Sequence, residues 1–302
     1  MSERRVLLLG GPTCSGKSEL AVELAERFDG EIVGADSRQI YRGMPIGTAA
    51  PTPEQRARVP HHLVAFLDPA ERYNAARFAR DATAVVTQIV ARGRRAIVVG
   101  GTGFYLRALA GDVTLAAAFD EVLRARLARE ARTHPPDVLH AWLASLDPQR
   151  ARALAPSDAY RVVRALEIAL AAGAVAPPVA HEPAAPATLR EAGFEPVKII
   201  LDVAASELDA RIDARTGAML AAGIVEEAER IGTAAIAADA VGYPAIFAYL
   251  AGFASQAELR ASLARATRRY AKRQRTWFRS EPAVRWVTPA AAGGLVRAEL
   301  GW

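Results

Sequence analysis

The segment "GGPTCSGKS" combines residue types that could hold a phosphate group. Gly11, Gly16, Lys17 and Ser18 fit the pattern G-x-x-x-x-G-K-[ST], between an apolar run and a helical one. In such a loop the backbone amides and the helix N-terminus face phosphate oxygens, the lysine adds a positive charge, and the serine hydroxyl suits Mg²⁺. We therefore predict that the whole loop binds phosphate: Gly11, Pro12, Thr13, Cys14, Ser15, Gly16, Lys17 and Ser18.

An acidic residue that is common in nucleotide hydrolases is missing from its usual place in this sequence. Those enzymes end an apolar strand with an Asp that helps to hold Mg²⁺, whereas "AIVVGGTG" ends in glycines and Thr102. This weakens the hydrolase hypothesis. Asp36, at the end of "EIVGADS", could hold the metal, accept a proton from an acceptor substrate, or cap the next turn. Thr102 could in turn cap the helix that follows it.

Two groups of cations could bind anions. Arg211 and Arg215 lie four residues apart on a predicted helix, and they could reach one phosphate cluster or be solvated surface residues. The stretch "RATRRYAKRQRTWFR" contains no acid, and its expected helix has one stripe with Arg265, Arg268, Lys272, Arg275 and Arg279 and another with Tyr270, Gln274 and Trp277. Such a basic face either binds a nucleic-acid backbone or is merely solvated.

The elements that must position these residues alternate in type. Strands are expected near residues 5–11, 30–37, 94–103 and 197–203, and helices at 17–28 and 74–93. Asn74 should cap the second helix, and a later helix should begin at Ser206 and stop at Gly223. The alternation predicts the α/β class: a parallel sheet flanked by helices, with ligands at the carboxyl ends of the strands.

From about residue 115 the pattern becomes helical almost throughout, and residues 173–196 contain five prolines. We therefore predict a phosphate-loop core formed by residues 1–114 and 196–302. Residues 115–195 should form a mainly helical insertion with a proline-rich connection.

Composition narrows the class of protein. With 302 residues, 51% of them hydrophobic, the chain can bury a sizeable core. Its single cysteine excludes a disulfide framework and favours a reducing compartment. No apolar run reaches the roughly 20 residues that span a bilayer. We expect a cytoplasmic monomer without a membrane segment. The excess of 38 Lys+Arg over 33 Asp+Glu suggests a polyanionic partner if it is concentrated at one place.

Several longer motifs resemble, in the same order, the bacterial tRNA dimethylallyltransferases. They cover roughly residues 5 to 280: "GPTCSGKS", "GEIVGADSRQIYRGMPIGTAAPT", "VPHHLVAFLDP", "VGGTGFYLRAL", "PSDAYRVVRALEI", "RIDARTGAML", "VGYPAIFAYLAG" and "TRRYAKRQRTWFR". Enzymes of that family transfer a dimethylallyl group from its diphosphate to the exocyclic amine of the adenosine just 3′ of the anticodon. The loop would then hold the diphosphate of a prenyl donor, with Mg²⁺ as the cofactor and tRNA as the partner.

The resemblance also implies roles for individual residues. Asp36 would be the general base, helped in catalysis by Lys17, Thr102 and Arg215, while Arg211 and Arg215 would bind the diphosphate. The anticodon stem-loop would contact Asp36, Ser37, Arg38, Gln39, Tyr160, Arg161, Arg164, Arg268, Lys272 and Arg275. The target adenine would flip into a channel between core and insertion. One departure is Pro244, where the family usually has a basic residue.

Three other functions compete with this interpretation. An adenylate isopentenyltransferase would use a free nucleotide, a small-molecule kinase would use ATP, which could occupy the same loop, and a nucleotide-gated RNA binder would catalyse nothing. The basic tail argues against the first two, and Asp36 with Arg211 and Arg215 argues against the third.

Overall fold

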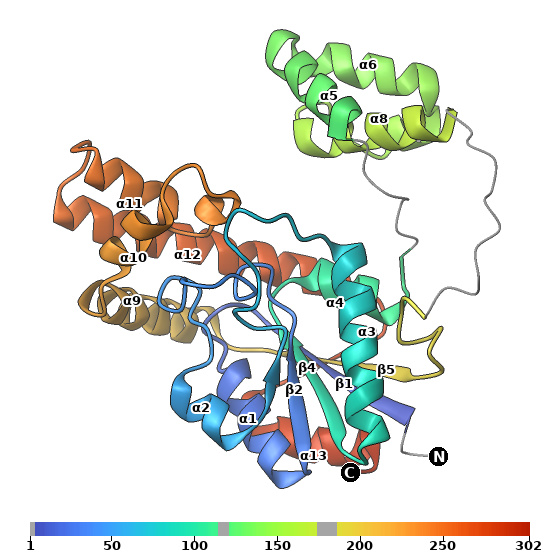
Figure 1. The fold of residues 1–302 in the computed structure, drawn as a ribbon, viewed down its shortest axis with the longest axis vertical. Coiled ribbons are helices and arrows are strands. Elements are labelled where there is room, and N and C mark those ends of the chain that lie inside the picture. Colours follow the sequence, from blue (N-terminus) through green and yellow to red (C-terminus); the bar gives the residue numbers. More distant parts are fainter. Residues whose placement is uncertain (1–3, 114–120, 174–185) are drawn as a thin grey trace. The chain divides into compact units, whose positions relative to one another are not determined.

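The computed structural model describes residues 4–113, 121–173 and 186–302 (Figure 1). The chain forms two compact units. The first contains residues 1–114 and 185–302, and the second contains residues 115–184.

The first unit is built on a six-stranded sheet in the order β3-β2-β4-β1-β5-β6, and all neighbouring strands are parallel. The strands are β1 (Arg5–Gly10), β2 (Gly30–Gly34), β3 (His61–His62), β4 (Arg95–Gly100), β5 (Glu195–Leu201) and β6 (Val284–Val287). Because β4 lies between β1 and β2, the carboxyl ends of these three strands meet at one edge. The predicted α/β class is confirmed.

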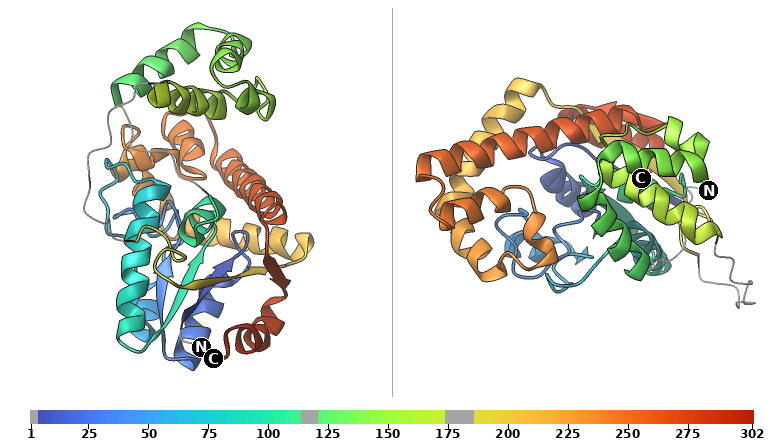
Figure 2. Two further views of the ribbon diagram at one scale, coloured as in Figure 1. Left: turned by 90° about the vertical axis from the view of Figure 1, so that its right-hand side faces the viewer. Right: turned by 90° about the horizontal axis from the view of Figure 1, so that it is seen from above.

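Helices cover both faces of the sheet (Figures 1 and 2). On one face α1 (Lys17–Arg27) and α13 (Pro289–Leu300) pack on a core that includes Leu7 and Leu9 of β1. Side chains alternate along a strand, so Val6 and Leu8 point to the opposite face, which α3 (Ala75–Ala91) and α4 (Gly103–Ala110) cover. A strand buried on both faces reads as a continuous apolar run, as "RVLLLG" does.

A helical lobe follows the fifth strand. It consists of α9 (Ala205–Ala221), α10 (Ile224–Ile231), the 3₁₀ helix η2 (Ile236–Asp239), α11 (Tyr243–Leu250) and α12 (Gln256–Arg279). Its core also contains Ile40, Tyr41 and Met44 from the segment after β2, so the lobe packs against the edge where the strands end. The short helix α2 (Pro53–Arg58) lies in the same connection. Figure 2 shows α12 as the long helix beside α9.

The capping predictions had mixed outcomes. Asn74 caps α3 as expected, because its side chain accepts a hydrogen bond from the Arg77 amide. Ser206 does not cap α9: that helix starts at Ala205, and its N-cap, Ala204, makes no side-chain hydrogen bond. Gly223 does follow the end of α9, in the left-handed region at φ 91°.

The second unit is helical, with α5 (Glu121–Thr133), α6 (Pro136–Leu146), α7 (Pro148–Arg152) and α8 (Ala159–Gly173) around a small core of its own. Residues 186–195, which the sequence placed in the insertion, belong to the first unit. Leu189 is fully buried there, and its amide donates to the Leu109 carbonyl of α4. Proline content marks a connection, but packing decides where the core resumes.

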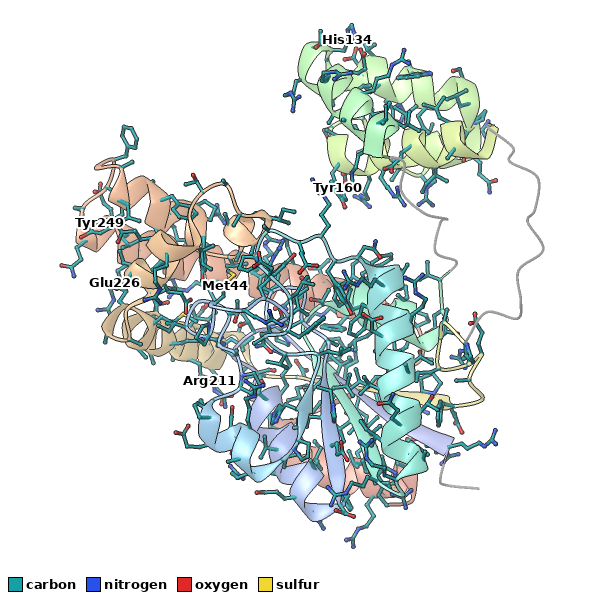
Figure 3. All side chains as sticks on the ribbon, viewed as in Figure 1. Met44, His134, Tyr160, Arg211, Glu226 and Tyr249 are labelled. Atoms are coloured by element: carbon teal, nitrogen blue, oxygen red, sulfur yellow. The ribbon has the colours of Figure 1, made fainter. Side chains whose placement is uncertain are left out.

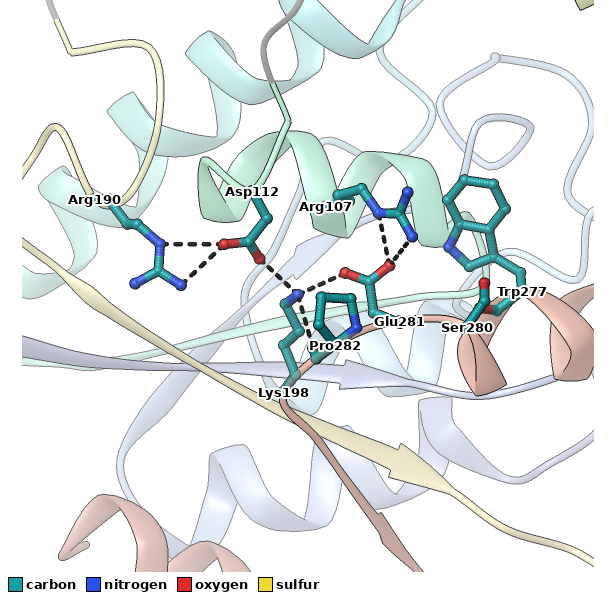
Figure 4. Close-up of polar contacts among 8 residues, drawn as sticks. All are labelled: Arg107, Asp112, Arg190, Lys198, Trp277, Ser280, Glu281 and Pro282. Atoms are coloured by element: carbon teal, nitrogen blue, oxygen red, sulfur yellow. Dashed lines mark hydrogen bonds and ion pairs between the residues drawn. The ribbon is translucent and has the colours of Figure 1, made fainter. Parts of the chain in front are cut away.

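A buried chain of charges joins three elements of the first unit (Figure 4). The Lys198 ammonium group of β5 is 2.6 Å from Asp112 and 2.6 Å from Glu281. Arg107 of α4 also pairs with Glu281, and Arg190 pairs with Asp112. Burial opposes ionisation of Asp112, but hydrogen bonds from Lys198 and Arg190 outweigh it and lower the pKa of this carboxyl group. The end of α12 is thereby tied to α4 and β5.

We predict that Glu281→Ala lowers the free energy of unfolding by about 3 kcal/mol, because it leaves the buried Lys198 and the partly buried Arg107 short of a partner. Urea denaturation measures the loss. The exposed pair Arg5–Glu195 supplies the matched control, and Glu195→Ala should cost about 0–1 kcal/mol. Equal losses in the two variants would show that the buried network contributes nothing special.

Candidate active site

A pocket of about 290 Å³ lies where β1, β2 and β4 end. Its walls come mainly from the phosphate loop, the segment after β2, α9 and α12, with further contributions from Ile224 of α10 and from residues 239–241. The polar side chains in it include Lys17, Ser18, Asp36, Arg215 and Tyr270. Residues from distant parts of the sequence therefore share one site.

The phosphate loop has the backbone geometry that its sequence predicts. Gly16 adopts φ 86°, a left-handed conformation that suits glycine, directly before α1. The Ser15 amide donates to the Pro12 carbonyl and closes the turn. The fully buried Ser15 hydroxyl finds no partner among the described residues. The Lys17 ammonium group donates to the Pro12 carbonyl at 3.3 Å and lines the pocket.

Three cations converge on this loop. Arg215 Nη1 lies 3.2 Å from Thr13 Oγ1 and 3.6 Å from Cys14 Sγ, and Arg211 donates to the Cys14 carbonyl at 3.1 Å. Figure 3 shows Arg211 projecting from α9. Burial lowers the pKa of Lys17 from 10.5 to about 8; nearby Asp36 opposes this effect, and Arg215 adds to it. An anion in the pocket would reverse that cost.

Asp36 faces the pocket while it also caps a turn. Its Oδ1 accepts hydrogen bonds from the amides of Arg38, at 2.9 Å, and Gln39, at 3.3 Å. In the described parts of the chain, Oδ2 accepts none. The capping role left open above is therefore real, and it leaves one carboxylate oxygen for another partner. Thr102 starts α4 without a side-chain cap; its hydroxyl instead accepts from the Ser37 amide at 3.0 Å.

The turn after Asp36 forms another wall. Arg38 pairs with Asp239, and Gln39 donates to the carbonyls of Thr48 and Ala49. The family resemblance implied that the side chains of Arg38 and Gln39 contact the acceptor stem-loop, whereas here they bond within the protein. They also shape the pocket at the side away from the phosphate loop.

The basic stripe on α12 is divided in the structure. Arg268 pairs with Asp209 and Asp213 of α9, and Arg275 lies 3.6 Å from Asp202. Lys272 is exposed. The pocket instead receives Thr267, Tyr270, Arg273 and Gln274 from this helix. Burial raises the pKa of Tyr270, so its hydroxyl stays neutral.

Three further predicted residues lie on the second unit. Tyr160 is 74% exposed and extends from α8 (Figure 3), Arg161 pairs with Asp158, and Arg164 pairs with Glu167. These contacts are internal to that unit.

Sequence reasoning missed two features of this region. An open groove of about 520 Å³ shares Asp239 and Arg273 with the pocket, and Arg265 and Arg269 also line it. Arg265 belongs to the stripe predicted above, but Arg269 and Arg273 do not; the three recur at every fourth residue of α12, a helical spacing that could have been found in the sequence. The second feature is an apolar pocket wall formed by Ile212, Met219, Ile224 and Leu263. It comes from three helices, so no local pattern predicts it.

The donor set fits Mg²⁺ only with help from a ligand. Within the described residues, no group of three or more His, Cys, Asp or Glu side chains could hold a metal. Ser18 and Asp36 line the same pocket, and Mg²⁺ commonly combines one or two such groups with phosphate oxygens and water. No helix in the described ranges has the length and apolar character to cross a membrane.

Comparison with known proteins gives consistent relatives. The IPP transferase family matches residues 39–281. The chain is 44% identical over 291 residues to the tRNA dimethylallyltransferase of Geobacter sulfurreducens, covering 95% of this chain and 92% of that protein. It is 47% identical over 283 residues to the enzyme of the same name from Halorhodospira halophila, covering 91% and 90%. The crystal structure of the full-length tRNA isopentenylpyrophosphate transferase from Bacillus halodurans matches with a TM-score of 0.71 and 34% identity, covering 99% of this chain and 97% of that chain.

The lowered pKa of Lys17 predicts a pH dependence of anion binding. Only protonated Lys17 attracts a diphosphate, so affinity should be nearly constant between about pH 7 and pH 8 and fall by up to about tenfold per pH unit above that. Calorimetric titration with methyl diphosphate measures this, since that ester keeps its own charge in this range. Lys17→Arg stays charged and should remove the decline. A flat profile for the unaltered protein would contradict the prediction.

Proposed function

We propose, because this chain belongs to the IPP transferase family, that it transfers a dimethylallyl group from dimethylallyl diphosphate to tRNA. The acceptor is the exocyclic amine of the adenosine 3′-adjacent to the anticodon, and the product is N6-isopentenyladenosine. Because the acceptor is tRNA, we infer that the reaction takes place in the cytoplasm.

One observation carries this proposal. A single pocket combines a phosphate loop with its cations, a carboxylate with a free oxygen, and an apolar wall. Lys17 and Arg215 suit the diphosphate, Asp36 suits the amine, and the wall around Met219 suits the five-carbon chain between them. Phosphoryl transfer to a small polar acceptor would not require an apolar wall beside the transferred group, whereas prenyl transfer does.

The residues assign a role to each bond that changes. The bond between the allylic carbon and the diphosphate oxygen breaks, and its electron pair leaves with the diphosphate. Lys17, Arg215 and the loop amides stabilise that charge. The amine nitrogen forms the new bond to the carbon, and its proton passes to Asp36. The adenine amine is a weak nucleophile because its lone pair is delocalised into the ring, so a positioned base helps.

Ser18 and the diphosphate oxygens would hold Mg²⁺, and Asp36 lines the same pocket. When bound, this ion would neutralise charge on the leaving group. The protein residues supply the remaining interactions: they hold the diphosphate, exclude water from the apolar wall and accept the proton.

For the RNA backbone we propose the groove of Arg265, Arg269 and Arg273. It continues from the pocket, and its one acid, Asp239, is already paired with Arg38. Pro244 lines the same groove and brings no charge, whereas the arginines of α12 do. In the basic stripe predicted from the sequence, carboxylates partly neutralise Arg268 and Arg275. The groove is therefore the better phosphate site, and exposed Lys272 could add to it from the side.

The direct test incubates the protein with dimethylallyl diphosphate and either an anticodon stem-loop or AMP at equal concentration. Mass spectrometry of the nucleosides identifies the product. We expect the prenylated nucleoside from the stem-loop alone. Equal rates with AMP would favour the adenylate enzyme, and phosphoryl transfer from ATP to a small acceptor would favour the kinase.

We predict that Asp36→Asn lowers turnover by about 100- to 10,000-fold, because the amide cannot take the proton. The amide oxygen can still accept hydrogen bonds from the Arg38 and Gln39 amides, so the turn should persist. Stem-loop affinity, measured by fluorescence anisotropy, should stay unchanged. Turnover at the wild-type rate would reduce Asp36 to a cap.

The groove makes a prediction about salt. The double variant Arg265→Ala/Arg269→Ala should flatten the log-log dependence of stem-loop affinity on salt by roughly two units, since each phosphate contact adds nearly one. The matched control, Arg268→Ala/Arg275→Ala, removes two ion-paired cations from the same helix and should change the slope much less. The reverse result would place the RNA backbone on the side of α12 that carries Arg268 and Arg275.

A further inference from the structure

Gln274 of α12 joins the two sides of the pocket through its side-chain amide. It is 5% exposed. Its Oε1 accepts a hydrogen bond from the Thr13 amide at 2.7 Å, and its Nε2 donates to the Gly101 carbonyl at 2.9 Å. The reverse orientation would set donor against donor and acceptor against acceptor, so both bonds depend on one orientation of the amide.

The bond to Thr13 fixes the diphosphate side. Arg215 holds the Thr13 hydroxyl while Gln274 holds its amide, so two helices grip this one loop residue. Pro12 has no N–H, and the Ser15 amide already donates within the loop. Gln274 therefore keeps the early part of the loop in place, while the amides of Cys14 and Lys17 remain for the diphosphate.

The bond to Gly101 fixes the acceptor side. Gly101 precedes Thr102, whose hydroxyl accepts from the Ser37 amide next to Asp36. A Cβ atom at Gly101 would lie only 2.2 Å from Gln274 Nε2, so glycine permits this close approach. A change in the position of Gly101 would reach Asp36 through two consecutive contacts.

We propose that Gln274 is a positioning residue for the transfer reaction. It sets the distance between the loop that holds the leaving diphosphate and the carboxylate that takes the proton. This role rests on the proposed function, because it concerns how that reaction is aligned. Both polar atoms of its side-chain amide are bonded within the protein, so it acts through Thr13 on one side and Gly101 on the other.

Two near-isosteric variants separate the two bonds. Gln274→Met removes both. Gln274→Glu keeps an oxygen for the Thr13 amide but sets its other oxygen against the Gly101 carbonyl. Thr276→Ala, at an exposed position on the same helix, is the control.

The proposal makes a different prediction for each measured quantity. Turnover with the stem-loop should fall about 10- to 100-fold in both variants, because small misplacements of reacting groups cost this much. Calorimetric affinity for methyl diphosphate should fall about fivefold in Gln274→Met, because the Thr13 bond is lost, and at least as much in Gln274→Glu, because its new negative charge lies beside the loop. Stem-loop affinity should match wild type in both Gln274 variants, and Thr276→Ala should match wild type in every measurement.

A residue that only fills the core would give another result. Both variants would then have lower thermal midpoints but wild-type turnover and affinity in the folded protein, which would overturn the proposal. Wild-type affinity for methyl diphosphate in Gln274→Met would overturn it as well. If the unaltered protein transferred nothing, the proposed function would fail, and the methyl diphosphate affinities would still decide whether Gln274 positions the loop.

Discussion

The site depends on the parallel placement of β4 between β1 and β2. The register pairs Gly10 with Gly100 and Gly34 with Val99, so the three strands end at one level. The segments that leave them carry the phosphate loop, the turn with Asp36, and Thr102 between the two. Because β4 lies between them, the strands that lead to the phosphate loop and to Asp36 are two strand spacings of about 4.8 Å apart, which leaves room for a ligand between the two.

Given that arrangement, the electrostatics of the pocket follow from burial. Lys17, Arg211 and Arg215 converge on a loop whose amides already favour anions. The lowered pKa of Lys17 reports mainly the cost of burying its charge, which Asp36 offsets in part and repulsion from Arg215 increases. A bound diphosphate removes that cost. The same residues whose charges are unfavourable in the free site therefore stabilise the negative charge that develops on the leaving diphosphate.

The neighbouring charges are handled in another way. Lys198, Asp112 and Glu281 form a buried network with mutual partners, and it joins α4, β5 and the end of α12. Farther along α12, Gln274 makes the neutral connection between the phosphate loop and Gly101. One long helix is thus anchored at its end by paired charges, and its middle portion faces the pocket with Tyr270 and Arg273. The paired charges at the end of α12 thereby help to hold the part of the helix that carries Gln274.

The sequence alone determined the phosphate loop and the α/β class, because local motifs and strand periodicity carry that information, and the resemblance to the transferase family grouped Asp36, Thr102 and the arginines of α9 with the loop. Local signals were less reliable at boundaries: Ser206 does not cap α9, and Leu189 returns the chain to the core before the predicted residue 196. The tertiary structure decided which side of α12 faces the pocket. Helical periodicity groups Arg268, Lys272 and Arg275, but only packing reveals that Asp202, Asp209 and Asp213 partner two of them. The apolar wall and the two bonds of Gln274 join residues far apart in the chain, and contacts of that kind are set by how the elements pack and not by any local pattern.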